Sequence, residues 1–162
     1  MKGKLILTMV TAVLLILFFA CGGEDGESKA GSEKEKDVIQ EGVSVAKEIL
    51  DTFDQAVAEA VDLVKGKPEP AVVQPQLQAL YAKYEGKMKA LNVKYLALKE
   101  KDIQAFGAAN SYLGENRGKH VFKKDRELGK YISHYNYQVQ DLEIGNMLSR
   151  EIVNMLDIAV QR

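Results

Sequence analysis

Residues 37–66, DVIQEGVSVAKEILDTFDQAVAEAVDLVKG, carry the longest regular pattern in the chain. Apolar residues recur there at alternating steps of four and three: Ile39, Val43, Ala46, Leu50, Phe53, Val57, Ala60 and Val64. Four heptads of this kind predict one long amphipathic helix. Its other faces carry seven acidic residues and a single lysine, Lys47. The helix should end near Lys65-Gly66, because glycine suits a left-handed cap and Pro68 cannot continue a helix.

A second amphipathic stretch follows the connector 67–74, and Pro75 suits its first turn. Its apolar positions are Leu77, Leu80, Tyr84, Met88, Leu91, Tyr95 and Leu98, followed by Phe106. Its polar positions carry six lysines against three acidic residues. Opposite charges therefore favour antiparallel pairing of the first two helices, although each exposed pair contributes only tenths of a kcal/mol.

Residues 110–118, NSYLGENRG, are rich in Gly and Asn and predict a turn. A third helical stretch should run from about Lys119 to Ala159. Its core candidates are Val121, Phe122, Leu128, Ile132, Tyr135, Val139, Leu142, Leu148, Ile152, Met155 and Ala159. Gly129 and Gly145 each cost about 1 kcal/mol in a helix interior, so either could mark a break. We therefore expect an all-α fold, an elongated antiparallel bundle of three long helices, or four if the last one breaks.

Composition limits the class of protein. The 162 residues include 22 Lys and Arg against 23 Asp and Glu, and 46% are hydrophobic. This length suits one domain, which we place at residues 37–162. The balanced charge argues against a dedicated nucleic-acid binder. A single cysteine excludes an intrachain disulfide and any multi-cysteine metal site.

The first twenty residues have the pattern of an export signal. Lys2 and Lys4 precede an uncharged, mostly apolar run at 5–19, which is shorter than the ~20 residues of a bilayer span and matches the apolar region of a signal peptide. An uncleaved signal-anchor helix is the alternative. Residues 22–36, GGEDGESKAGSEKEK, contain no large apolar residue. We therefore predict a flexible tether at 21–36.

The end of the apolar run, Phe18-Phe19-Ala20-Cys21, resembles the lipobox of bacterial lipoproteins. This resemblance implies removal of residues 1–20 as a signal peptide and lipidation of Cys21 with acyl chains such as palmitate. It also implies attachment to the membrane of the cell envelope, and in a Gram-negative cell to the outer membrane, facing the periplasm. No family is recognised for the helical domain.

Motifs for catalysis or cofactor binding are absent from the sequence. It contains no Glu-x-x-His, no His-Glu-x-x-His, no Cys-x-x-Cys-His and no Gly-x-Ser-x-Gly. We therefore expect neither an enzyme nor a bound cofactor. A haem held by His134 together with Met88, Met147 or Met155 is a formal alternative.

Two groups of residues are candidates for partner binding. The first is a basic cluster within residues 117–130: Arg117, Lys119, Lys123, Lys124 and Arg126. It could contact anionic lipid head groups, a cell-wall polymer or an acidic partner. Alternatively, it could serve as a face for the acidic first helix or as solvated surface. The second is aromatic and comprises Tyr131, His134 and Tyr135, which share one helix face. These side chains suit recognition and also suit a bundle core.

The sequence thus predicts a lipid-anchored, non-enzymatic binding or scaffolding bundle. Its expected partners are the membrane, through the anchor, and another envelope protein or a cell-wall component, with no nucleic acid and with a monomer favoured over a homodimer. The alternative is a carrier of a small molecule, haem or a metal inside the bundle.

Overall fold

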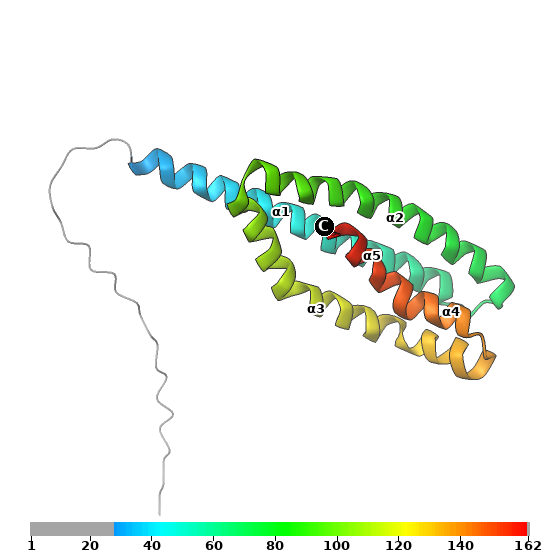
Figure 1. Ribbon diagram of the computed structural model, residues 1–162. Helices are drawn as coiled ribbons and strands as arrows, with labels where there is room; N and C mark the ends of the chain where they lie inside the picture. The colour runs from blue at the N-terminus through cyan, green and yellow to red at the C-terminus, as the bar shows by residue number, and fades with distance from the viewer. Residues whose placement is uncertain (1–27, 162) are drawn as a thin grey trace, which may run out of the picture.

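The chain folds into an elongated bundle whose helices run antiparallel, one after another (Figure 1). The computed structural model describes residues 28–161, with side chains from residue 35 onward. Every element in this range is helical, which confirms the all-α expectation. The last stretch is broken, so the four-helix alternative is the one observed. None of the helices between residues 28 and 161 combines the length and the apolar character that crossing a bilayer requires.

The first helix, α1 (Ser28–Val64), begins at Ser28 instead of Asp37. Residues 28–36, which the sequence places in the tether, therefore belong to this helix. Lys, Glu and Ala, which are good helix formers, fill most of this segment, and lengthening an existing helix needs no new nucleus. The predicted signal peptide, Cys21 and the remainder of the tether lie outside the described residues.

The predicted apolar stripe of α1 forms the centre of the core from Ala46 to Val64. Its first two members are not buried, and Ile39 is 42% exposed. Ile49 and Ala56 are also fully buried, although they lie outside the predicted stripe. The buried face is wider than a two-helix seam because α1 packs against both α2 (Pro70–Lys101) and α3 (Ile103–Ser133).

The connection between α1 and α2 differs from the expected one in two places. Lys67, and not Gly66, adopts the left-handed conformation, with φ 51°, and its N–H donates to the Val64 carbonyl at 2.9 Å. Helix α2 then starts at Pro70, so Pro75 lies inside the helix. Pro70 suits this start because the first N–H groups of a helix have no intrahelical partner.

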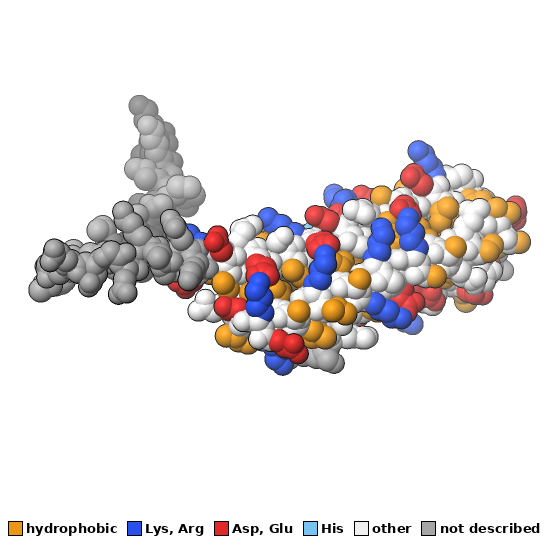
Figure 2. All heavy atoms as spheres, turned by 90° about the horizontal axis from the view of Figure 1, so that it is seen from above, with side chains coloured by type: hydrophobic (Ala, Val, Ile, Leu, Met, Phe, Trp, Pro, Cys, Tyr) orange, Lys and Arg blue, Asp and Glu red, His pale blue; other side chains and the backbone are white. Residues whose placement is uncertain are grey.

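All seven predicted core positions of α2 are buried: Leu77, Leu80, Tyr84, Met88, Leu91, Tyr95 and Leu98. Three ion pairs join α2 to α1: Glu41–Lys101 at 2.8 Å, Glu48–Lys94 at 2.7 Å and Glu59–Lys83 at 2.7 Å. Steps of 7 and 11 residues along α1 are matched by steps of 7 and 11 residues backward along α2. The expected antiparallel pairing of acidic and basic helices is therefore confirmed. Figure 2, seen from the side on which α2 lies, shows basic and acidic side chains interleaved along the bundle.

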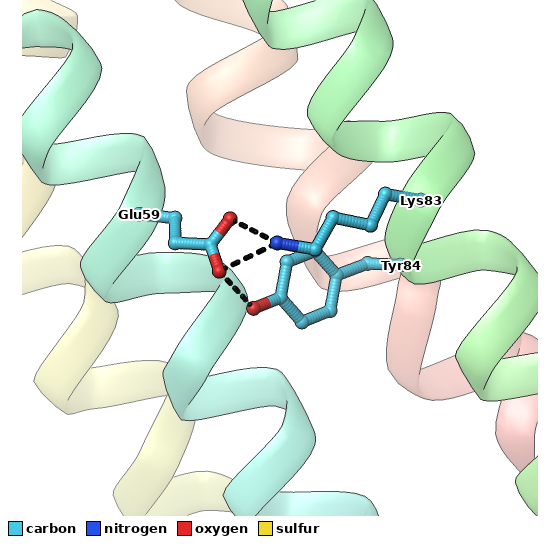
Figure 3. Close-up of polar contacts among 3 residues, drawn as sticks. All are labelled: Glu59, Lys83 and Tyr84. Atoms are coloured by element: carbon cyan, nitrogen blue, oxygen red, sulfur yellow. Dashed lines mark hydrogen bonds and ion pairs between the residues drawn. The ribbon is translucent and has the colours of Figure 1, made fainter.

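Glu59 makes the most extensive of these contacts (Figure 3). Its carboxylate accepts hydrogen bonds from Lys83 Nζ and, at 2.7 Å, from the Tyr84 hydroxyl. The bond from Lys83, followed by that from Tyr84, lowers the pKa of the Glu59 carboxyl. Burial, together with the hydrogen bond to Glu59, raises the pKa of Tyr84 to about 12. The fully buried ring of Tyr84 thus has an acceptor for its hydroxyl at the edge of the core.

The predicted turn at residues 110–118 is wrong, because these residues lie inside α3. The chain reverses instead at Asp102, whose backbone is extended and whose carboxylate accepts a hydrogen bond from Gln104 N–H at 2.7 Å. One aspartate cap therefore starts the helix. Asn110 and Asn116 donate to the carbonyls of Phe106 and Tyr112 at 2.8 and 2.9 Å. Bonds along the helix thus satisfy two residues that would otherwise favour a turn.

The last stretch breaks at Gln140 and Asp141, not at Gly129 or Gly145. After α3, a π-helical turn η1 (His134–Val139) leads to Gln140, which has φ 62°. The chain then returns through α4 (Leu142–Asn146), a second π-helical turn η2 (Met147–Glu151) and α5 (Ile152–Ala159). Asp141 caps α4 by accepting from Ile144 N–H at 3.0 Å.

This break changes which of the predicted core residues are buried. Leu128, Tyr135, Leu148, Ile152, Met155 and Ala159 are buried, and Val121 and Ile132 pack partly against the core. Phe122, Val139 and Leu142 were wrongly assigned to the core, since they are 64%, 37% and 70% exposed. A single helical register does not persist through the two π-helical turns and the reversal, and therefore a 3.6-residue pattern misplaces Val139 and Leu142. Phe122 lies before this break, on an exposed side of α3 next to Val121, which packs against the core.

Candidate functional site

A cavity of about 620 Å³ opens between α3 and α5. Its walls are mainly apolar and come from α1, α3 and α5, with Ile49, Leu113, Val121, Val153, Leu156 and Val160. Tyr95 of α2 and Asn110 of α3 contribute the polar wall, together with Arg117. Ligand cavities in proteins typically have volumes of about 300–1,000 Å³ and such mixed, mostly apolar linings.

Two glycines of α3 contribute no side chain to this part of the lining. Gly114 and Gly118 lie one turn apart in the lining, and a Cβ atom added at either would meet nothing within 4 Å. The opposite wall ends early, because α5 stops at Ala159, partway along the bundle (Figure 1). Asn92 of α2 fixes this end by donating to the Ala159 and Gln161 carbonyls at 3.2 and 2.8 Å. The cavity therefore lies beside α5, close to the point where this helix ends.

The polar groups of the lining form hydrogen bonds within the protein. The Tyr95 hydroxyl donates to Asn110 Oδ1 at 2.6 Å, and Arg117 Nη2 donates to Asp157 Oδ1 at 2.7 Å. The Arg117 side chain is 38% exposed and is the one charged group in the lining of this cavity, within the part of the chain that the structure describes. The cavity thus combines apolar walls with a single cation.

The candidate basic cluster does not form one exposed face. Lys123 donates to Asp54 of α1 at 2.8 Å, and Arg117 pairs with Asp157 of α5. Lys124 is only 3% exposed; it donates to the Ser149 carbonyl at 3.2 Å and also pairs with Asp125. Three of the five basic residues therefore join α3 to other helical segments, and Lys123 is the one of these three that pairs with the acidic first helix.

The other two basic candidates lie on the surface. Lys119 is exposed and donates to Asn116 Oδ1 at 2.9 Å. Arg126 is also exposed, and its guanidinium lies over the Phe122 ring, 5.4 Å from the centroid. Neither residue belongs to the cavity lining.

The candidate aromatic residues are placed mainly in the interior. Tyr131 and Tyr135 are buried, and the Tyr135 hydroxyl donates to the Pro68 carbonyl at 2.8 Å. The partly buried ring of His134 lies edge-on to Tyr135, and its Nδ1 is 2.7 Å from Gln138 Oε1. Both tyrosines therefore belong to the core, as the core interpretation expected, and Tyr135 also bonds to the connection between α1 and α2. No group of three or more His, Cys, Asp or Glu side chains suited to a metal ion occurs among the described residues.

Sequence reasoning found only Arg117 among the residues of the cavity lining that could recognise a ligand. It assigned Asn110, Gly114 and Gly118 to a turn, and Tyr95 to the core alone. The sequence does contain a pattern that could have identified this wall of the cavity. Asn110, Gly114 and Gly118 share one helical face with Arg117 and Val121, at steps of three and four residues. The turn-forming composition of the segment hid this face.

A second polar cluster, Asp54, His120 and Lys123, joins α1 to α3. His120 Nδ1 and Lys123 Nζ lie 2.9 and 2.8 Å from the two Asp54 carboxylate oxygens. Burial alone would raise the pKa of Asp54, but the hydrogen bonds from Lys123 and His120 outweigh it and hold the pKa below its ordinary value of 3.8. The cluster therefore favours the charged carboxylate.

Replacing Asp54 with Asn should lower the free energy of unfolding at about pH 7 by on the order of 1 kcal/mol, less than the ~1.5–3 kcal/mol of a buried bond to a charged group. The folded-state pKa lies below 3.8, so the stabilisation is complete above that value and is lost as the pH falls through the folded-state pKa. Denaturant titrations of the unsubstituted protein and of Asp54→Asn, at about pH 7 and about pH 3, should show a smaller difference in the free energy of unfolding at the lower pH. Asp51→Asn, at an exposed position of α1, is the control. An equal difference at both pH values would contradict this role of Asp54.

Comparisons with protein-family models, curated proteins and solved structures give no match to this chain. Its class therefore rests on its own geometry. The described part is an antiparallel four-helix bundle with a lateral apolar cavity.

Proposed function

We propose that this chain is a bacterial envelope lipoprotein whose helical bundle binds or scaffolds another envelope component without catalysing a reaction. The lipobox-like Phe18-Phe19-Ala20-Cys21 and the apolar run before it support the anchor. Acylation at Cys21 with two or more chains would give stable membrane attachment, whereas a single chain binds only marginally. The proposed site of action is the envelope, on the periplasmic face of the outer membrane in a Gram-negative cell.

The observation that carries this proposal is the projection of α1 beyond the other helices (Figure 1). About 14 residues of α1 precede Gly42 and span about 20 Å; from residue 35, where burial is described, Gly42 is the first buried residue. This segment leads back along the chain towards Cys21. A helix of this kind would separate a lipid-held N-terminus from the bundle and leave the bundle accessible to a partner, which we propose to be an envelope protein or a cell-wall component. We also propose that the bundle acts as a monomer.

Replacing Cys21 with Ser should move the protein from the membrane fraction to the soluble fraction or to an unprocessed precursor, because serine offers no thiol for acylation. Cell fractionation and incorporation of labelled palmitate provide the measurements. Ser28→Ala, which leaves the cysteine intact, should remain lipidated and membrane-bound. Unchanged membrane retention of a cleaved Cys21→Ser protein would contradict the anchor.

The cavity favours a second function, that of a small-molecule carrier. Its volume of about 620 Å³ and its mainly apolar walls fit an apolar ligand. Its lining contains no histidine, cysteine or methionine among the described residues. A small organic molecule therefore suits this lining better than haem or a metal.

A further inference from the structure

The cavity between α3 and α5 is elongated along the helix axis. Its α3 wall runs from Asn110 to Val121, about 17 Å at the rise of an α-helix. On the opposite side, Val153 and Leu156 of α5 and Val160, just after its end, line the cavity along the same axis. The cavity is therefore long enough to suit a ligand with an extended chain.

The polar residues of the lining lie at two positions along the α3 wall. Tyr95 and Asn110 lie at one end, where they are hydrogen-bonded to each other. Arg117 lies further along α3 and is partly exposed to solvent. A guanidinium carries five N–H donors, and the bond to Asp157 uses Nη2. Arg117 can therefore bind an anionic group while its ion pair with Asp157 persists.

We infer that this cavity binds a single-chain amphiphile with an acidic head group, with its acyl chain between α3 and α5 and its anion on Arg117. This inference rests on the second proposed function, that of a small-molecule carrier. The volume suits one acyl chain, and each buried methylene favours binding. A fatty acid and a lysophospholipid share this chemistry.

The test uses the full chain in phosphatidylcholine vesicles and palmitate carrying a diazirine. After irradiation, the labelled peptides are mapped by mass spectrometry. We expect label on the α3 segment around residues 110–121 and on α5. Gly118→Leu should reduce this labelling about tenfold by filling the cavity. Gly107→Leu is the matched control, because Gly107 is also a glycine of α3 with open space around it and lies outside the lining.

A second pair of variants tests the head group by removing the charge of Arg117 while keeping a polar side chain at that position. Arg117→Gln should weaken labelling by the acid about tenfold, the loss of one charge-assisted hydrogen bond, and should leave labelling by the corresponding diazirine alcohol unchanged. Lys119→Gln, at an exposed position outside the lining, should affect neither probe. Competition by unlabelled palmitate or lysophosphatidylglycerol then distinguishes a carboxylate ligand from a phosphate ligand.

The outcomes separate this inference from the carrier function. If acid and alcohol label the cavity equally and Arg117→Gln changes nothing, the acidic head group is overturned and the carrier function stands. If neither probe labels α3 or α5 above the level in Gly118→Leu, both fail. Circular dichroism of each variant confirms that the bundle is intact. If Gly118→Leu does not fold, the Arg117 pair decides.

Discussion

Replacing Phe53 with Ala should lower the free energy of unfolding by about 3–5 kcal/mol, the usual loss for truncating a buried phenylalanine. Phe53 is fully buried near the middle of the core stripe of α1, where α1 packs against α2 and α3. A domain of this size has only about 5–15 kcal/mol of stability in total. The variant should therefore show a strongly lowered thermal midpoint, measured by circular dichroism.

The matched control for this substitution is Asp51→Ala. Asp51 lies two residues away on the exposed side of α1. A surface change of this kind typically alters stability by no more than about 0.5 kcal/mol. Equal melting of the two variants would show that residues 46–64 do not form the core face in this register.

Replacing Gly42 with Ala should destabilise the bundle by about 1–3 kcal/mol, the range for inserting an atom into a closely packed site. Gly42 is buried, and a Cβ atom there would overlap the carbonyl oxygen of Ala105 at the start of α3. Because that oxygen belongs to the backbone, it cannot move aside by a side-chain rotation. We therefore expect α1 and α3 to separate at this crossing, and denaturant titration measures the cost.

The same substitution at Gly86 should have the opposite sign. Gly86 lies on the exposed face of α2, and a Cβ atom there meets nothing within 4 Å. Alanine should stabilise the helix by up to about 1 kcal/mol because it loses less conformational entropy than glycine. A stabilising Gly42→Ala substitution would contradict the close approach of α1 and α3.

The sequence predicted the parts of the fold that depend on a repeated local pattern. The seven core residues of α2 and the stripe of α1 from Ala46 to Val64 follow a helical period without interruption. The pairing of α1 with α2 followed from their opposite charges. Periodicity and net charge act along a whole helix, so a single unusual residue does not obscure them.

The errors occurred where one residue outweighs the composition around it. Asp102 reverses the chain with a single side-chain cap, whereas the glycines and asparagines at 110–118 lie in a helix. The chain reverses at Gln140, although glycine propensity favours a break at Gly129 or Gly145. Packing between distant segments decides such cases, and sequence propensity is only a weak prior.

The candidate site was the least predictable part for a related reason. A cavity depends on where one helix stops relative to another, here α5 beside Gly114 and Gly118 of α3. No local pattern records that relation. Arg117 was selected for its charge within a basic cluster, and its place at the cavity follows only from the fold.

The three ion pairs between α1 and α2 are separated by 7 and then by 11 residues along each helix. This unequal spacing restricts how the two helices can align. If α2 slid by one heptad in either direction, Glu59 would face Gln76 or Ala90 in place of Lys83. The Tyr84 hydroxyl would at the same time lose its carboxylate acceptor. A uniform heptad ladder would tolerate such a slide, because every shifted position would find an equivalent partner. The 11-residue step to Glu59 therefore specifies the register: it distinguishes the observed alignment of two otherwise repetitive helices from alignments shifted by one heptad.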